Sequence, residues 1–201
     1  FSAHEWEPLT SRWSTSQSQS EYTAYVSKIR ESIAFGGVYQ VNACRILSHP
    51  LEGGSLEGLF SQLLERNPAE FAFYLNIDGL EVASASPERF LSRTGSKITT
   101  SPIKGTIRSE ENVFGDKDKA ENLMIVDLMR NDLGRICEAG SIEVSELFRH
   151  EKHPGITHLV SDVEGRLKDG ISWSQILRAT MPPGSVSGAP KSAALSIIKE
   201  S

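Results

Sequence analysis

Apolar residues recur every three or four positions in several stretches of the chain, which is the spacing of one buried helix face. The first such helix is predicted from Glu21 to Gly36, with Ser20 as the residue that caps its start. The pattern predicts further helices over residues 55–66, 117–129 and 173–179, and a last one that starts near Pro190.

β-Branched and aromatic residues are enriched between these helices, which predicts strands. Asp78 and Gly79 form the turn of one predicted hairpin, and residues 94–96 form the turn of a second one. The strands are predicted over residues 38–47, 71–77, 80–85, 90–93, 97–100, 142–148 and 156–163. Antiparallel hairpins mixed with helices predict an α+β fold of layered antiparallel β-sheets rather than a doubly wound parallel sheet.

Composition and charge exclude several classes of protein. The chain has 201 residues, of which 38% are hydrophobic, so it can bury a substantial core. Its formal net charge of −5 argues against nucleic acid or an anionic membrane as the main partner. No apolar run approaches the roughly 20 residues that cross a bilayer, and residues 1–4 do not begin a signal peptide. Cys44 and Cys137 support neither a disulfide framework nor a zinc site, so a cytoplasmic location is expected.

The chain is expected to have a short lead-in followed by one domain. Residues 1–20 are rich in Ser, Thr and Gln and are expected to be loosely ordered. Residues 21–201 then form the domain. Because the sequence begins without Met and ends within an apolar periodicity, we expect it to be an excerpt of a longer protein.

Acidic residues cluster at the start of the helix predicted over residues 117–129. On a helix, Asp118 and Glu121 lie about 60° apart, so both carboxylates share one face. Such hard oxygen ligands suit Mg²⁺, which commonly uses one or two protein carboxylates together with an anionic substrate. The alternative is a solvated helix start whose acidic residues are favoured by the helix dipole.

A loop of small residues leads into the last predicted helix and contains Ser185, Gly188, Ala189 and Lys191. Backbone N–H groups at such a junction bind carboxylates or phosphates, and Lys191 adds a positive charge. The spacing differs from that of a P-loop, and a plain connection between two elements is the alternative.

Lys104, Glu88 and His158 are three further candidates for chemistry. Lys104 follows a predicted strand, and a desolvated lysine can act as a nucleophile, whereas most turn lysines are only solvated. Glu88 also follows a strand and offers a carboxyl for acid catalysis, the alternative being an exposed turn acid. His158 lies on an apolar strand face, so a satisfied core histidine is the alternative to a catalytic one.

Taken together, several collinear segments resemble the chorismate-utilising enzymes, from about Tyr39 to the C-terminus. The segments read YQVN at 39–42, SPE at 86–88, PIKGT at 102–106, ENLMIVDLMRNDL at 121–133, HLVS at 158–161 and GSVSGAPK at 184–191. Members of this family act on chorismate or its isomer with Mg²⁺. Their fold is α+β, with layered antiparallel sheets and helices, so the resemblance implies that this chain forms an incomplete portion of that fold.

Two positions distinguish the branches of the family. Isochorismate-forming members carry a water-activating lysine where this chain has Gln40, which disfavours that branch. Anthranilate-forming members usually have alanine at the position of Lys104, whereas lysine is similar to the members that aminate chorismate at C4. The resemblance therefore implies synthesis of 4-amino-4-deoxychorismate, on the route to p-aminobenzoate and folate.

The resemblance also implies a role for each candidate residue. Lys104 would attack C2 of chorismate while Glu88 protonates the C4 hydroxyl, and ammonia would then add at C4 and expel the lysine. Ammonia would come from a glutamine amidotransferase, as a separate subunit or a fused domain. Glu121 would bind Mg²⁺ on the ring carboxylate, with Asp118 in its outer shell. His158 would complete the catalytic residues, and the implied substrate-binding residues are Thr106, Ser185, Gly188, Ala189 and Lys191.

The chain departs from the family pattern at a few positions. Ile107, Ser192 and Ala193 stand where members usually have arginine, so some charge contacts are missing or come from elsewhere. Whole members are much longer, so this chain alone is expected to hold an incomplete site and to be weakly active or inactive. Two alternatives remain: anthranilate synthesis, which Lys104 disfavours, and a segment that only binds chorismate or the amidotransferase.

Overall fold

The computed structural model of the protein describes residues 6–51, 53–110 and 113–200. The chain divides into two compact units, Phe1–Val26 with Cys44–Glu88 and Ser27–Ala43 with Arg89–Ser201. This division differs from the predicted lead-in and single domain, whose boundary at residue 20 falls within helix α1 (Gln19–Ala34). Each unit is described by itself.

Helix α1 begins at Gln19, two residues before the start at Glu21 that the apolar pattern predicts. Ser18 caps it: its hydroxyl accepts from the N–H of Glu21 at 3.3 Å, and Glu21 Oε2 accepts from the N–H of Ser18 at 2.7 Å. The prediction of Ser20 as the cap is wrong, because the reciprocal capping box needs a Ser three residues before the Glu.

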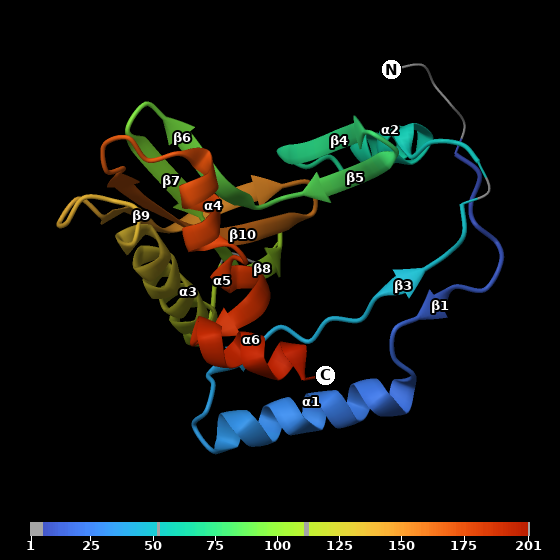
Figure 1. The fold of residues 1–201 in the computed structure, drawn as a ribbon, viewed down its shortest axis with the longest axis horizontal. Helices are drawn as coiled ribbons and strands as arrows, with labels where there is room; N and C mark the ends of the chain where they lie inside the picture. Colours follow the sequence, from blue (N-terminus) through green and yellow to red (C-terminus); the bar gives the residue numbers. More distant parts are fainter. Residues whose placement is uncertain (1–5, 52, 111–112, 201) are drawn as a thin grey trace. The chain divides into compact units, whose positions relative to one another are not determined.

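In the first unit, a hairpin and one helix form the packed part. Strands β4 (Phe71–Ile77) and β5 (Leu80–Ser86) confirm the first predicted hairpin. At its turn Asp78 and Gly79 both have positive φ, 48° and 84°, as a two-residue hairpin turn requires. Helix α2 (Glu57–Arg66) packs on the hairpin, where Phe60 stacks on Tyr74 with 5.8 Å between ring centroids (Figure 1).

The described part of the N-terminal segment is tied down by backbone pairing. Strand β1 (Ser14–Thr15) pairs antiparallel with β3 (Leu47–Ser48), and the N–H of Ser16 donates to Ile46 O at 2.9 Å. Residues 1–5 of the predicted lead-in lie outside the described residues. The strand predicted over 38–47 is mostly irregular, because this stretch pairs only briefly, as β3 and as β2 (Gln40–Val41).

A five-stranded antiparallel sheet forms the centre of the second unit (Figure 1). Its strands are β6 (Arg89–Thr94), β7 (Lys97–Ser101), β8 (Ile103–Arg108), β9 (Glu143–His153) and β10 (Ile156–Arg166). Strand β10 is paired along both edges, with β9 along one and with β7 and β8 along the other. The second predicted hairpin is β6–β7, and β9 and β10 extend beyond their predicted ends because they pair with each other along most of their lengths.

Helix α3 (Asp116–Gly134) packs against this sheet and closes the hydrophobic core (Figure 1). Ile125, Met129 and Leu133 of α3 are buried in one cluster with Ile98 of β7 and Val163 of β10. Full burial of such side chains contributes about 1.5–3 kcal/mol each. The helix continues past residue 129, where the sequence predicts its end, because its last turn adds Leu133 to this core.

A buried polar residue, Asn122, joins α3 to β10. Its Nδ2 donates to Leu159 O at 3.1 Å, and its Oδ1 accepts from Ser161 Oγ at 2.6 Å. The same hydroxyl accepts from the N–H of Phe148 on β9 at 3.1 Å. Asn122 and Ser161 are both fully buried, so every one of these groups depends on the others for its hydrogen bonds.

Short elements complete the second unit. They are α4 (Trp173–Thr180), α5 (Gly184–Ser187), β11 (Gly188–Ala189) and α6 (Lys191–Lys199). Ser172 and Gln175 form a capping box at the start of α4, and β11 pairs with β2. Pro190 is the N-cap of α6, one position before the first helical residue.

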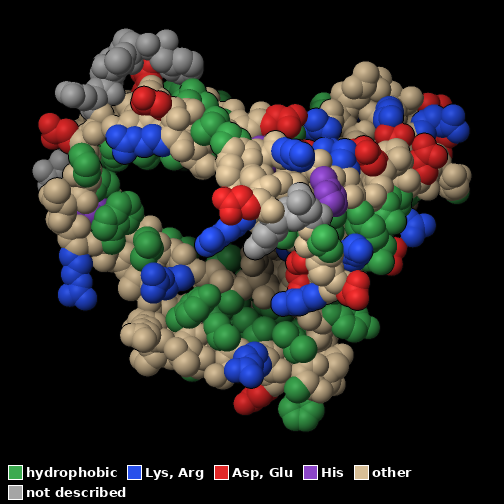
Figure 2. Space-filling view, turned by 180° about the vertical axis from the view of Figure 1, so that it is seen from behind, with side chains coloured by type: hydrophobic (Ala, Val, Ile, Leu, Met, Phe, Trp, Pro, Cys, Tyr) green, Lys and Arg blue, Asp and Glu red, His purple; other side chains and the backbone are tan. Residues whose placement is uncertain are grey.

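The strand pairings of the described residues are all antiparallel, which confirms the predicted α+β class. On the face shown in Figure 2, acidic and basic side chains are interspersed, in line with the small net charge. Within the described ranges, no helix is both long enough and apolar enough to cross a bilayer.

Replacing Asn122 by alanine should lower the free energy of unfolding by about 3 kcal/mol, because the carbonyl of Leu159 and the hydroxyl of Ser161 would be left buried without their partner. Urea denaturation measures this. The matched variant Lys119→Ala, on the exposed side of the same helix, should change stability by less than about 0.5 kcal/mol. Equal effects of the two substitutions would contradict the structural role of Asn122.

Candidate active site

A bulge in β8 places Lys104 and Gly105 in the sheet. From Thr106 to Ile103 the strand uses three steps while β10 uses two, from His158 to Val160, so β8 carries one extra residue. Gly105 has a φ of 86°, and a Cβ atom added there would lie 2.9 Å from the Cβ of Asp118. A glycine is therefore needed both for the backbone conformation and for the close approach of α3.

Lys104 is half-buried on this bulged strand. Over the part of the chain that the structure describes, its ammonium group makes no hydrogen bond and no ion pair. A lysine in a folded strand without a carboxylate partner is available for a ligand or a reaction.

Thr106 and His158 meet across the pairing of β8 and β10. Thr106 Oγ1 lies 2.9 Å from His158 Nδ1, and the two residues are directly opposite in register. His158 is 7% exposed. Burial lowers the pKa of His158, and the nearby His153 lowers it further, whereas Glu151 acts in the opposite direction. The imidazole is therefore neutral near pH 7 and able to exchange hydrogen bonds with a ligand.

Three polar residues of β9 lie beside this pair. Glu151 is directly opposite His158, and its Oε1 lies 2.9 Å from His153 Nε2. Arg149 donates to Glu151 Oε2 at 2.6 Å. These hydrogen bonds and charges lower the pKa of Glu151 in spite of its partial burial, which raises it. Sequence reasoning missed these three residues, although their spacing of two along a strand was a signal that they share one face.

The predicted metal ligands lie in the first turns of α3 and are not equivalent. Asp118 Oδ2 accepts from the N–H of Gly115 at 3.0 Å, so this carboxylate caps the helix. Glu121 remains half exposed, 3.7 Å from Lys117 Nζ. Among the described residues, no three His, Cys, Asp or Glu side chains come together as a metal site. The residues present thus fit Mg²⁺ as one carboxylate, Glu121, whose remaining ligands come from water, substrate or elsewhere.

The loop before α6 is held by backbone pairing rather than left open. Gly188 has a φ of 145° and packs against the backbone carbonyl of Gln40, so a side chain there would clash. The carbonyl of Ala189 accepts from the N–H of Tyr39 at 2.7 Å. Ser185 is half-buried in α5, which lies between α4 and this pairing.

Lys191 makes a buried ion pair with Asp132. Its Nζ donates to Asp132 Oδ2 at 2.5 Å and to Thr180 O at 3.2 Å, and the two side chains are 12% and 3% exposed. Burial raises the pKa of Asp132, and the hydrogen bond from Lys191 opposes this. The predicted anion-binding charge is therefore already neutralised within the fold.

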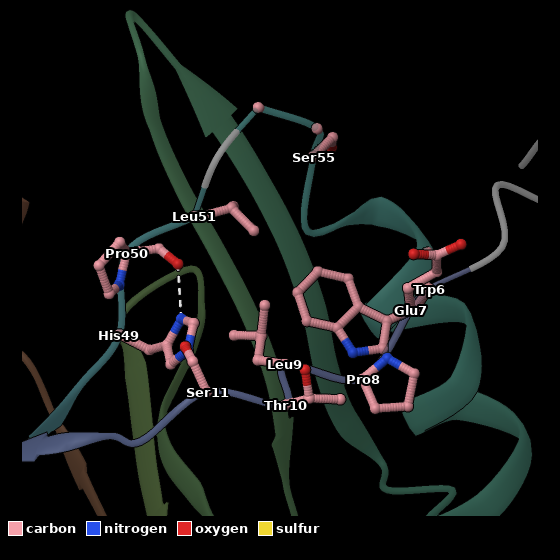
Figure 3. A pocket seen from close by; sticks show the side chains of 13 residues that line it. Trp6, Glu7, Pro8, Leu9, Thr10, Ser11, His49, Pro50, Leu51 and Ser55 are labelled. Atoms are coloured by element: carbon pink, nitrogen blue, oxygen red, sulfur yellow. Dashed lines mark hydrogen bonds between the residues drawn. The ribbon is translucent and has the colours of Figure 1, made fainter.

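Each unit has a cavity, and neither gathers all the candidates. In the second unit, a cavity of about 630 Å³ is lined by Ala189 and Lys191 together with Met124, Leu128 and Asp132. In the first unit, a cavity of about 610 Å³ is lined by Trp6, Leu9 and His49, among others (Figure 3). His49 Nδ1 lies 2.5 Å from Pro50 O. None of the predicted site residues lines the cavity of the first unit.

The family of chorismate binding enzymes matches this sequence over residues 1–201. The chain belongs to that family. Aminodeoxychorismate synthase component 1 of Escherichia coli (strain K12) is 40% identical to it, over 100% of this chain and 46% of that protein. Anthranilate synthase component 1 of Aquifex aeolicus (strain VF5) is 37% identical, over 96% of this chain and 41% of that protein.

The solved structure of anthranilate synthase component I from Streptococcus pneumoniae TIGR4 superposes with a TM-score of 0.83 and 30% identity. The superposition covers 94% of this chain and 44% of the chain in that structure. The chain thus spans less than half the length of each of these three relatives, which confirms the predicted incomplete portion of the family fold.

In this member of the family, the candidate residues of the second unit fall into three groups. Thr106 and His158 lie opposite each other on β8 and β10, and Lys104 lies two residues before Thr106 on β8. Asp118 and Glu121 lie at the start of α3. The last group, at the start of α6 and before it, comprises Ser185, Gly188, Ala189 and Lys191. Glu88 belongs to the first unit.

Lys191→Met should lower the free energy of unfolding by about 3 kcal/mol or more, because the buried Asp132 carboxylate loses its cation. The double variant Asp132→Asn/Lys191→Met should recover part of this loss, since neither charge remains buried. Both are measured by urea denaturation. A Lys191→Met protein as stable as the wild type would show that this ion pair does not hold the loop.

The stability of the protein should fall as the pH drops from the ordinary histidine pKa toward the lowered pKa of His158. In that window the unfolded chain binds the proton more readily than the folded one, whereas above it the contribution is fully present. His158→Asn should reduce this acid sensitivity, measured as urea midpoints over a pH series. His150 lies on the other face of the sheet, so His150→Asn should keep the acid sensitivity. An unchanged dependence of stability on pH in His158→Asn would show that His158 is not its source.

Proposed function

We propose that this chain forms part of an aminodeoxychorismate synthase component I, which converts chorismate and ammonia into 4-amino-4-deoxychorismate for p-aminobenzoate and folate synthesis. The observation that carries the proposal is Lys104, which is half-buried, has no ion pair among the described residues, and lies in the bulge that precedes Thr106. The 40% identity to the E. coli protein of that name supports it.

In the proposed reaction, Lys104 adds to the substrate before ammonia does. Nζ of Lys104 forms a bond to C2 of chorismate, both ring double bonds shift by one position, and the C4–O bond breaks as the hydroxyl takes a proton and leaves as water. Ammonia then bonds to C4 and gives up a proton, both double bonds shift back, and the C2–Nζ bond breaks to return the amine. Two allylic displacements replace one difficult displacement, and no oxidant or reductant is consumed.

Glu88 is the proposed source of the proton for the departing hydroxyl. Its N–H donates to Ser86 Oγ at 3.4 Å, which fixes the backbone of this carboxyl at the end of β5. Because Glu88 belongs to the first unit and Lys104 to the second, their joint action on one substrate is inferred from the family motifs.

The remaining candidates are proposed to bind the substrate. Thr106 and neutral His158 offer hydrogen bonds without adding charge, and the segment with Ser185, Gly188 and Ala189 offers backbone donors. Lys191, already paired with Asp132, contributes by holding this segment in place. Mg²⁺ on Glu121, with Asp118 outside it, would neutralise the ring carboxylate.

Ammonia is proposed to come from glutamine through an amidotransferase, as a partner subunit or a fused domain. The word "component" in the names of the relatives supports a multi-part enzyme. A cytoplasmic location remains a prediction from the cysteine usage.

Anthranilate synthesis is the second candidate activity. The superposition on anthranilate synthase component I of S. pneumoniae, with a TM-score of 0.83, favours it. In that reaction ammonia enters at C2 and pyruvate leaves, so Lys104 would have no covalent role. A segment that only binds chorismate is the third possibility.

The full-length protein, incubated with chorismate, Mg²⁺ and ammonium, should yield 4-amino-4-deoxychorismate by mass analysis. Lys104→Ala should lower its formation by at least about 100-fold, the scale expected when a covalent nucleophile is removed. Lys28→Ala, at an exposed ion pair on α1, should leave the rate unchanged. Anthranilate as the product, insensitive to Lys104→Ala, would move the protein to the second candidate, and chorismate binding without any product would support the third.

A further inference from the structure

Glu151, His158 and Thr106 form one rung of side chains across three neighbouring strands. Glu151 of β9 and Thr106 of β8 are each directly opposite His158 of β10. Side chains opposite one another in antiparallel strands lie about 4.5–5.5 Å apart at Cβ and share one face of the sheet. The rung therefore contains a carboxylate, an imidazole and a hydroxyl on one face.

His153 completes the arrangement from a diagonal position. It lies two residues beyond Glu151 on β9, and its ring centroid is 5.1 Å from that of His158, with 59° between the planes. Glu151 receives His153 on one carboxylate oxygen and Arg149 on the other. Arg149 is held in turn by Glu146, at 3.2 Å, and by Asp162, at 3.6 Å. Glu146 is exposed, whereas the side chains of Arg149, Glu151, His153 and Asp162 are partly buried, so water screens the contacts among these four less than at the surface.

We propose that Glu151 is a positioning residue that holds His153 against His158 and so keeps the His158 ring hydrogen-bonded to Thr106 with its other nitrogen free for the substrate. Thr106 occupies Nδ1, whichever of the two groups donates. No hydrogen bond between described residues is formed by Nε2 of His158, which leaves this atom for a ligand. The chain from Arg149 through Glu151 and His153 fixes the ring from the side that Thr106 does not reach.

The charges around His158 make this arrangement sensitive to protonation. On β9, Glu151 and His153 lie next to His158, and Arg149 and Glu146 lie beyond them. On β10, Asp162 pairs with Arg149. On β8, Lys104 and Arg108 lie two residues before and after Thr106. A positive charge on His153 disfavours a second one on His158, which agrees with the lowered pKa of His158. The arrangement thus keeps His158 neutral where Lys104 must act.

The first test does not use activity, so it is independent of the proposed function on which the catalytic meaning of His158 rests. The ring-proton signal of His158 is followed by NMR as a function of pH in the wild type, in His153→Phe and in His150→Phe. Phenylalanine keeps an aromatic ring at 153 but removes the charge, so the titration of His158 should shift upward. His150 meets Phe114 edge to face on the other face of the sheet, and His150→Phe should leave the titration of His158 unchanged. An unshifted titration in His153→Phe would overturn the proposal.

The second test compares Glu151→Ala with Glu151→Gln. The amide oxygen of glutamine still accepts from His153, so the nuclear Overhauser contact between the rings of His153 and His158 should persist in Glu151→Gln and be lost in Glu151→Ala. In the full-length enzyme, kcat for chorismate should fall at least about tenfold in Glu151→Ala and recover in Glu151→Gln. Retention of the ring contact in Glu151→Ala would refute the positioning role. The ring contacts and titrations could also behave as expected in a protein that does not aminate chorismate. That outcome would support the positioning role of Glu151 and reject only the proposed function.

Discussion

The second unit depends on β10 being paired along both edges. With β9 on one side and β7 and β8 on the other, the strand can neither rotate nor slip without breaking two ladders of hydrogen bonds. Asn122 then ties one face of β10 to α3 through Leu159 and Ser161. Since successive side chains alternate, this contact turns His158 to the opposite face. The orientation of a candidate catalytic residue is thus a consequence of core packing, because a shift of one residue would exchange the two faces.

The bulge at Gly105 links this core to the candidate chemistry. It adds one residue to β8 and allows the first turn of α3 to approach the strand, where Asp118 caps the helix and contacts Gly105. The same short segment carries Lys104 and Thr106. Strand, helix start and candidate residues are therefore mutually dependent, and a side chain at position 105 would disturb all of them.

The two charged networks of the second unit have different roles. The pair of Lys191 and Asp132 is dry and self-neutralised, so it organises the loop before α6 at the cost of removing two charges from water. The network of Arg149, Glu151 and His153 is only partly buried and borders His158, so its charges act on a group that can still titrate. Burial and contact with His158 separate the two roles, although both networks pair a basic side chain with an acidic one.

The sequence alone determined the longer helices, the antiparallel hairpins, the α+β class and the family, since apolar periodicity, turn residues and collinear motifs are local signals. It did not determine β8, the length of α3, the cap of α1 or the division into two units, which depend on long-range packing. Among the candidate residues, tertiary structure decided that Thr106 meets His158, that Asp118 serves the helix rather than standing free, and that Lys191 is already paired. It also revealed Glu151 and His153 beside His158. Pairing between strands far apart in the chain places these groups together, and no local pattern of residues encodes that register.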